Sequence, residues 1–467
     1  MSLTKSSLIY TVGKILPQAV GFILLPIYTK YLTSDEYGLT ESMYMLIMVL
    51  SIFFSLGSER SLYRLYYDYD INEKKIFIGN VSILIFLISF IGTVFCFIFS
   101  DTLSLVFKSI PFNPYFTYSI LTAFLMSFSL IPLTLLQIEE KAILFLKLST
   151  SSFLLIVLFS LYFLLVEKEG AEGLVKGRFY GNLLIAPIYL YFVIKQSQFQ
   201  PNKQMIKNIV LFSSPMIPIL LTTWILNLSN RIFLEHFLTL SEVGIYSLAF
   251  KVSSLATIIP AAIFTAFSPI FYKYSNSNNT VLGNNKIQRL ISIISYITIA
   301  VCFIVSIFSK EILLLFFNEN YKDAIELVPM LVLSAFLISI SGFYNLMIYQ
   351  DKKPKVIMNI SILGAIISII SNYLLIPFLG IQGAAIATVI TSSTIFILKY
   401  LYAKRNYTIN LPILIISFCI FFFAIFTIID LQNSMEPKYS LLVKVLVVLF
   451  LFVIYYKKVK NIITSLN

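Results

Sequence analysis

Four basic residues lie inside long apolar stretches, where an ionisable side chain is costly to place and is by default a candidate functional group. They are Lys14, Arg231, Lys251 and Lys444. If the stretches are helical, Lys14 and Lys251 lie about 10–12 Å from the nearer helix ends. Glu41 is the acidic residue nearest to such a depth, and we expect it close to the start of its helix. Buried cations suit a diphosphate ligand, because Arg donates two parallel hydrogen bonds to phosphate and Lys supplies a point charge.

These basic residues also have structural explanations. Arg231 and Lys444 could extend along their helices to the lipid headgroups, and for Lys444 we expect this arrangement. Arg60 and Arg64 are four residues apart at a predicted helix end, so they share one helix face. They could capture a substrate, or they could contact headgroups and complement the helix dipole.

Three amide side chains are candidates for sugar recognition: Gln18, Asn227 and Asn230. An amide can donate hydrogen bonds to hydroxyl groups and accept them. Amides inside membrane helices also link neighbouring helices, so both roles stay open. The single histidine, His236, has no catalytic partner near it in the sequence.

The composition places these residues in a membrane protein. Of the 467 residues, 58% are hydrophobic and 12% are charged. Soluble domains carry about 25% charged residues, and this chain has too few polar groups to cover a soluble surface. The three cysteines lie in apolar runs without CxxC or Cys/His spacing, so we expect no disulfide, no metal site and no cofactor.

The apolar runs are long enough to span a membrane, since about 20 residues cross the hydrocarbon core. We predict an all-α membrane protein with about fourteen transmembrane helices. Connections between the runs are short, which leaves no room for an extramembrane domain. The approximate limits are 7–31, 39–62, 76–99, 114–136, 142–166, 173–194, 209–234, 243–271, 288–308, 324–349, 356–377, 381–402, 410–429 and 439–456.

Lys and Arg are concentrated on one side of this topology. Most of those outside the spans fall in the loops that share a side with the two termini. Positively charged loops stay in the cytoplasm, so we predict a multi-pass protein with both termini cytoplasmic. Basic loops beside anionic lipids account for the net charge of +12, and we expect membrane lipids and no nucleic acid as partners.

Two short patterns occur twice, at the same places relative to the spans. They are LTSDEYG at 32–38 with LTLSEVG at 238–244, and GAEG at 170–173 with GIQG at 380–383. We infer a repeat of about six helices and therefore two pseudo-symmetric lobes, residues 1–200 and 201–405, followed by two additional helices in 406–467. The repeat either reflects rocking of two lobes during transport or is an ancient duplication without a mechanical role.

Three stretches resemble bacterial polysaccharide flippases, the translocases of O-antigen and capsule repeat units. They are SSLIYTVGKILPQAVGFILLPIYTKYLTSDEYGL, FSLGSERSLYRLYYD and SSPMIPILLTTWILNLSNRIFLEHFLTLSEVGIYSLAFKVSSL. The resemblance extends through most of the chain and implies the superfamily that also contains drug and toxin exporters and the lipid II flippase. One departure is Asn230-Arg231, where that family often has an Asp-Arg pair.

The resemblance implies alternating access in a bacterial cytoplasmic membrane. The implied substrate is an undecaprenyl-diphosphate-linked oligosaccharide repeat unit moved from the cytoplasmic to the outer leaflet, with other polysaccharide-assembly proteins as further partners. The last two helices would form a groove for the prenyl tail, or would only complete the fold. We expect substrate contacts from Lys14, Gln18, Arg60, Arg64, Asn227, Asn230, Arg231 and Lys251.

Two other functions remain as alternatives. A multidrug exporter of the same superfamily would need acidic groups for cationic drugs, whereas the charges predicted within the spans are basic. A membrane glycan polymerase or glycosyltransferase would need positioned acids, bases or metal ligands, and no such cluster occurs in the sequence. We therefore expect a transporter and not an enzyme.

Overall fold

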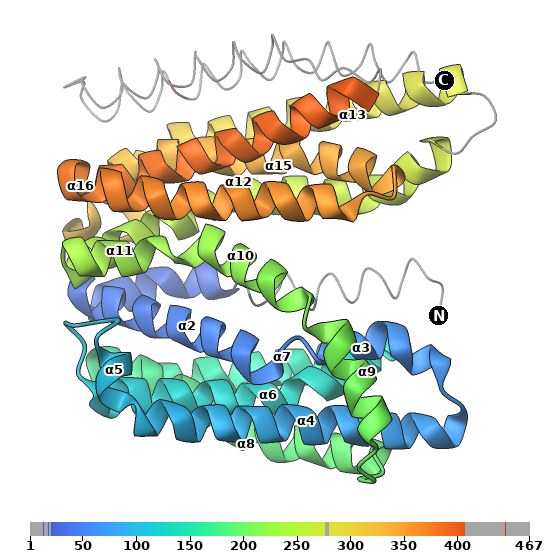
Figure 1. Cartoon of the computed structure of the whole chain (residues 1–467). Helices are drawn as coiled ribbons and strands as arrows, with labels where there is room; N and C mark the ends of the chain where they lie inside the picture. Colours follow the sequence, from blue (N-terminus) through green and yellow to red (C-terminus); the bar gives the residue numbers. More distant parts are fainter. Residues whose placement is uncertain (1–12, 14–16, 18–19, 276–279, 407–443, 445–467) are drawn as a thin grey trace. The chain divides into compact units, whose positions relative to one another are not determined.

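The computed structural model describes residues 13, 17, 20–275, 280–406 and 444. Within these residues the regular secondary structure is helical, without strands (Figure 1). The longer helices are α2 (Ser34–Ser55), α3 (Glu59–Leu65), α4 (Ile71–Ile98), α5 (Ser100–Ser104), α6 (Thr117–Ile138), α7 (Ala142–Leu161), α8 (Gly170–Gln196), α9 (Lys203–Ser213), α10 (Met216–Leu228), α11 (Asn230–Phe237), α12 (Leu240–Ser275), α13 (Thr280–Ile307), α14 (Ser309–Phe316), α15 (Ala324–Gln350) and α16 (Pro354–Asn406).

The helices confirm an all-α multi-pass membrane protein. Among the described residues, 10 helical segments are long and apolar enough to cross a membrane, and a shorter apolar helix covers Val20–Tyr31. One of the 10 is α16, which has a non-helical Gly380 inside it and thus contains two of the predicted spans. The last two predicted spans, 410–429 and 439–456, lie outside the described residues, so the total of fourteen stays a prediction.

The predicted span 209–234 falls on α9, α10 and α11, which are separated by two breaks. The candidate span in the structure, Lys203–Leu228, covers α9 and α10 and lies six residues earlier at each end. The first break falls at Ser214 and Pro215, between α9 and α10. Proline has no backbone N–H, so it cannot continue the hydrogen-bond ladder of the preceding helix. The second break falls at Ser229, which separates α10 from α11 and places Asn230 and Arg231 at the start of a new helix.

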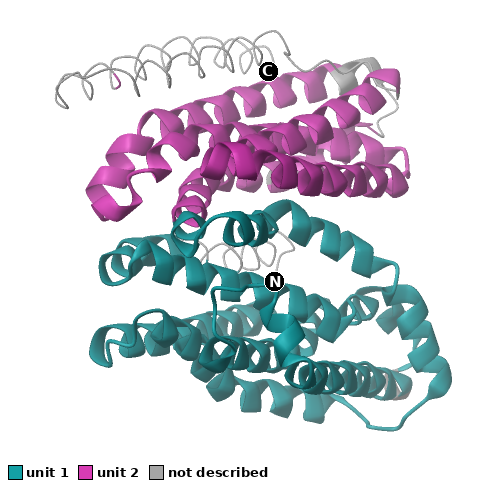
Figure 2. Cartoon of the chain, turned by 60° about the vertical axis from the view of Figure 1, so that its left-hand side comes forward, with its two compact units in different colours: residues 1–244 teal, residues 245–467 magenta. Residues whose placement is uncertain are grey.

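The chain forms two compact units, residues 1–244 and 245–467 (Figure 2). In the first unit, α2 contributes fully buried residues such as Met43 to a core shared with Ile120 of α6. In the second, α15 packs along α16 and α13. Tight van der Waals packing of this kind holds helices together in lipid. The two lobes were defined by the sequence repeat, and their boundaries at 200 and 405 stay a prediction.

The glycine pattern that occurs twice begins with a glycine of positive φ in both copies. Gly170 and Gly380 each have φ +57°, a left-handed value that favours glycine. Three residues later, Gly173 and Gly383 pack against the preceding helical segment: an added Cβ would lie 3.0 and 2.5 Å from its backbone. Each copy therefore uses one glycine to reverse the chain and a second to let the two segments approach.

The other repeated pattern lies at the start of a helix in both copies. Thr33 precedes α2, and its side chain and that of Glu36 form a capping box. In the second copy, the hydroxyl of Thr239 donates to Glu242 at the start of α12. A capping box satisfies backbone N–H groups that have no partner within the helix, so the first copy defines where α2 begins.

Candidate functional site

A buried ion pair joins α2 and α11 within the first unit. Glu41 Oε2 and Arg231 Nη2 are 4.0 Å apart, and each side chain is 2% exposed. Arg231 Nη1 also donates to the carbonyl oxygen of Asn227 at 3.1 Å. The alternative in which Arg231 extends to the headgroups is therefore excluded, because its guanidinium is enclosed by protein and lies against a carboxylate.

The sequence prediction placed Glu41 too close to a helix end. The capping box at Thr33 starts α2 at Ser34, five residues before the predicted limit. Glu41 therefore lies about two turns, or roughly 10 Å, into the helix. An acid at that depth needs a partner, since an unpaired buried charge is very costly. Arg231 supplies that partner and would be equally costly alone.

Two further residues complete what we call the α2 charge cluster, defined as Glu41, Tyr44, Arg178 and Arg231. The Arg178 guanidinium of α8 lies 4.9 Å from the centre of the Tyr44 ring. Tyr44 lies three residues after Glu41 on α2, so the two side chains share one face of that helix. Arg178 was not among the predicted site residues, although it lies inside the predicted span 173–194, and the structure places it on α8.

The α2 charge cluster is held in place by a contact from α10. The Trp224 indole donates to the backbone oxygen of Met45 at 3.2 Å. This bond connects α10 to α2 one residue beyond Tyr44. Because α10 leads directly into α11, the same contact positions the helix that carries Arg231.

Arg60 and Arg64 lie on α3, which follows the end of α2. Leu56 and Gly57 have φ +47° and +67°, so a left-handed turn separates the two helices. Arg60 Nε is 3.8 Å from Glu59 Oε1, and Arg64 pairs with Asp68 at 2.6 Å. Both arginines are exposed and accessible to a ligand or to headgroups. Their pairing contributes little to stability, because exposed ion pairs are weak.

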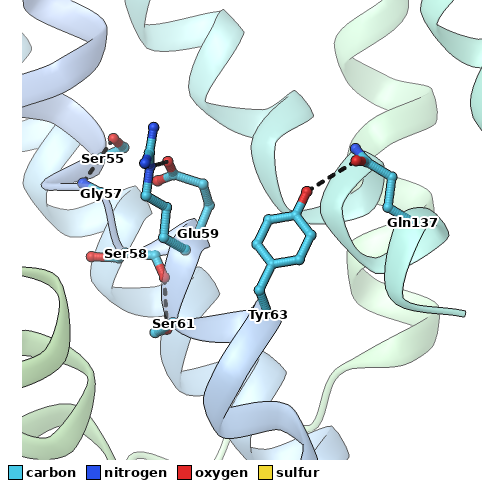
Figure 3. Close-up of polar contacts among 8 residues, drawn as sticks. Ser55, Gly57, Ser58, Glu59, Ser61, Tyr63 and Gln137 are labelled. Carbon is cyan, nitrogen blue, oxygen red and sulfur yellow. Dashed lines mark hydrogen bonds and ion pairs between the residues drawn. The ribbon is translucent and has the colours of Figure 1, made fainter. Parts of the chain in front are cut away.

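Neighbouring polar side chains fix the position of α3 (Figure 3). The Tyr63 hydroxyl donates to Gln137 Oε1 at 3.1 Å, which connects α3 to α6. Ser61 donates to the backbone oxygen of Ser58 at 2.7 Å within α3. Burial raises the pKa of the Glu59 carboxyl, and the charge of Arg60 opposes that increase.

The second unit holds two of the predicted cations. Lys251 is half-buried on α12. Lys444 is 1% exposed, and its Nζ lies 2.8 Å from Glu311 Oε1 of α14. The expectation that Lys444 reaches the headgroups is therefore wrong. The carboxylate of Glu311 compensates in part for the hydration that the Lys444 ammonium group loses on burial.

The other predicted substrate contacts come from one lysine and three amide side chains. Lys14 and Gln18 lie outside the described residues. Asn227 is exposed, and its amide donates to the carbonyl oxygen of Thr223 at 2.7 Å. Asn230 is buried beside Arg231 at the start of α11. The structure thus brings Asn227, Asn230 and Arg231 together at the junction of α10 and α11.

Comparison with known proteins identifies similar families and relatives. A family model described as "Polysaccharide biosynthesis protein" matches residues 3–275, and a second, MatE, matches residues 215–374. An "Uncharacterized membrane protein" of Haemophilus influenzae is 24% identical over 399 residues, covering 82% of this chain and 95% of the relative. The "Probable low-salt glycan biosynthesis flippase Agl15" of Haloferax volcanii is 24% identical over 183 residues, 39% of each chain.

Solved structures share the fold. The lipid II flippase MurJ in an inward closed conformation aligns with a TM-score of 0.74 at 13% identity, covering 96% of this chain and 98% of MurJ. An inward-facing multidrug resistance MATE transporter aligns with a TM-score of 0.64 at 15% identity, covering 85% and 94% of the two chains. At these identities the likeness establishes the fold alone.

Proposed function

Because the chain belongs to the polysaccharide biosynthesis protein family, we propose that it is a flippase for a lipid-linked glycan. Family membership makes the chain a transporter and not an enzyme. The observation that carries the proposal is the family match over residues 3–275. The flippase named among the relatives and the MurJ-like fold support it.

The substrate we propose is an undecaprenyl-diphosphate-linked oligosaccharide repeat unit of an O-antigen or a capsule. It would move from the cytoplasmic to the outer leaflet by alternating access of two lobes, with both termini in the cytoplasm. The α2 charge cluster, with two guanidinium groups and one carboxylate, supports a substrate that carries a diphosphate, because a diphosphate without counter-charges could not cross a hydrocarbon core.

The predicted site residues have separate parts in this proposal. Lys14 and Lys251 would accompany the diphosphate, and the three amides Gln18, Asn227 and Asn230 would contact sugar hydroxyls. Arg60 and Arg64, which are exposed on α3, would meet the substrate at the membrane surface. Arg231 would act together with Glu41, since the two form one buried pair.

A multidrug exporter is the second candidate, and two observations favour it: the MatE match over residues 215–374 and the buried carboxylate of Glu41. A cationic drug would need that carboxylate as its counter-charge. Arg231 already lies against it, so the pair has no net charge to offer a cation. The glycan therefore remains the better proposal.

A deletion strain tests the proposed function. Cells that lack this protein and have no second flippase should lose the surface polymer and accumulate diphosphate-linked repeat units on the cytoplasmic face. The wild-type gene should restore both. Normal polymer in the deletion strain would refute the flippase, and increased sensitivity to cationic dyes with normal polymer would favour the exporter.

A further inference from the structure

We propose that Arg178 is a phosphate-binding residue of the first unit, a role distinct from that of Arg231. This inference rests on the proposed flippase function and names the group that would contact the diphosphate. It starts from the charges of the α2 charge cluster, which contains two guanidinium groups and one carboxylate. Such a cluster carries one excess positive charge.

The ion pairing shows which cation is already neutralised. Glu41 lies against Arg231, and both are almost fully enclosed. Arg178 has no salt bridge with any described residue, and its Nη1 is buried without a hydrogen-bond partner there. Guanidinium N–H groups are strong donors, and leaving one unpaired in an apolar environment is costly. An anion that reaches Arg178 would satisfy both the donor and the excess charge.

The Tyr44 ring positions the guanidinium for such a ligand. The Arg178 guanidinium lies 4.9 Å from the ring centre. A contact between an arginine and an aromatic ring holds the guanidinium without using its N–H donors. The fork of donors thus stays available for phosphate oxygens, which match it in geometry.

Packing of α8 makes this position rigid. Added Cβ atoms at Gly177 and Gly181 would meet the backbone of α7, at 2.6 Å from Ile156 Cα for Gly181. Because these glycines lack a Cβ, α8 packs closely against α7. Arg178 follows Gly177 directly and projects from a different side of the helix, where it meets Tyr44 of α2.

Arg178 differs from an ordinary surface cation in its depth within the helix and in lacking, among the described residues, the counter-charge that a neighbouring lysine has. It lies eight residues beyond Gly170, the first residue of α8, or roughly 12 Å along the helix. Lys176, two residues earlier, already has its counter-charge, because its Nζ lies 2.6 Å from Glu169 Oε1. Lys176 therefore provides a control with a similar charge on the same helix.

The test is ligand binding by the purified full-length protein, with undecaprenyl diphosphate and undecaprenol as probes in native mass spectrometry. We expect the wild-type protein to prefer the diphosphate. Arg178→Gln should weaken diphosphate binding about tenfold or more without changing undecaprenol binding. Arg178→Lys should retain part of the preference, because a point charge replaces a fork. Lys176→Gln should bind as the wild type does.

The outcomes separate this inference from the proposed function. If Arg178→Gln binds undecaprenyl diphosphate as tightly as the wild type, or if the wild type does not prefer the diphosphate, Arg178 is not a phosphate site. The flippase proposal is then still decided by the deletion strain. If Arg178→Gln binds undecaprenol and unfolds thermally as the wild type does, the variant is folded. If it is not folded, diphosphate binding by Arg178→Lys tests the same inference.

Discussion

Gly38 and Gly244, which occupy equivalent positions in the two copies of the repeat, pack directly against each other. A Cβ on Gly38 would lie 2.9 Å from the backbone nitrogen of Gly244, and a Cβ on Gly244 would lie 3.0 Å from that of Gly38. Ser34 and Ser241 add a hydroxyl–hydroxyl hydrogen bond of 2.6 Å beside them. The contact is reciprocal, so neither position has room for a side chain.

Alanine at either glycine should separate the two helix starts. Gly38→Ala and Gly244→Ala each place a methyl group where backbone atoms now lie, so we expect a loss of stability of about 1–3 kcal/mol from overpacking. Transport should decrease with it. Thermal unfolding in detergent and polymer display at matched protein level measure the two effects. Gly21→Ala is the control, since an added Cβ there meets nothing within 4 Å.

A disulfide across the same contact should block transport. Ser34→Cys with Ser241→Cys places two thiols where hydroxyl oxygens are now 2.6 Å apart, within reach of a disulfide. If the contact must open during each cycle, oxidation should stop polymer display and reduction should restore it. Each single variant, in a background without Cys96, Cys302 and Cys419, is the control. Full transport by a completely cross-linked protein would show that the contact stays closed.

The Glu41–Arg231 pair should show strong coupling. Glu41→Gln or Arg231→Gln alone leaves a buried charge without its partner, which costs about 3–5 kcal/mol. The double variant should cost less than the sum of the two, because neither charge is then left behind. Thermal unfolding of the three variants provides the coupling energy. Additive effects would mean that the two side chains do not interact in the membrane.

Lys444→Ala should not be silent, in contrast to what the sequence suggests. Removing the lysine leaves Glu311 without a partner, although Glu311 is 29% exposed and water can hydrate it in part. We expect a lower unfolding temperature and a partial recovery when Glu311→Ala is added. An unfolding temperature equal to that of the wild type would show that the pair contributes nothing.

Reporter fusions test the predicted topology. A reporter that is active only outside the cytoplasm should be inactive after Lys203 and Lys458 and active near Glu169 and Asn433. The reason is the concentration of Lys and Arg on the predicted cytoplasmic side. Opposite activities at both pairs of sites would reverse the proposed orientation, and one discordant site would change the number of spans.

The sequence by itself determined the helical class, the membrane environment and most helix positions, because these depend on local composition. An apolar run of about 20 residues has to satisfy its backbone groups within itself, so it becomes a helix in lipid. The repeated glycine pattern could also be recognised in the sequence. The pattern at 170–173 recurs at 380–383, and in the structure Gly170 and Gly380, its first glycines, have the same positive φ of +57°.

Only the tertiary structure decided which charges face one another. Glu41 meets Arg231 and Lys444 meets Glu311 because their helices pack together, and residues far apart in the sequence carry no local signal of that. Glu41 also lies deeper in its helix than the sequence prediction placed it, because α2 starts at Ser34. At that depth its carboxylate needs a partner. The charge state of a buried site depends on pairing and depth, which are properties of helices packed in three dimensions.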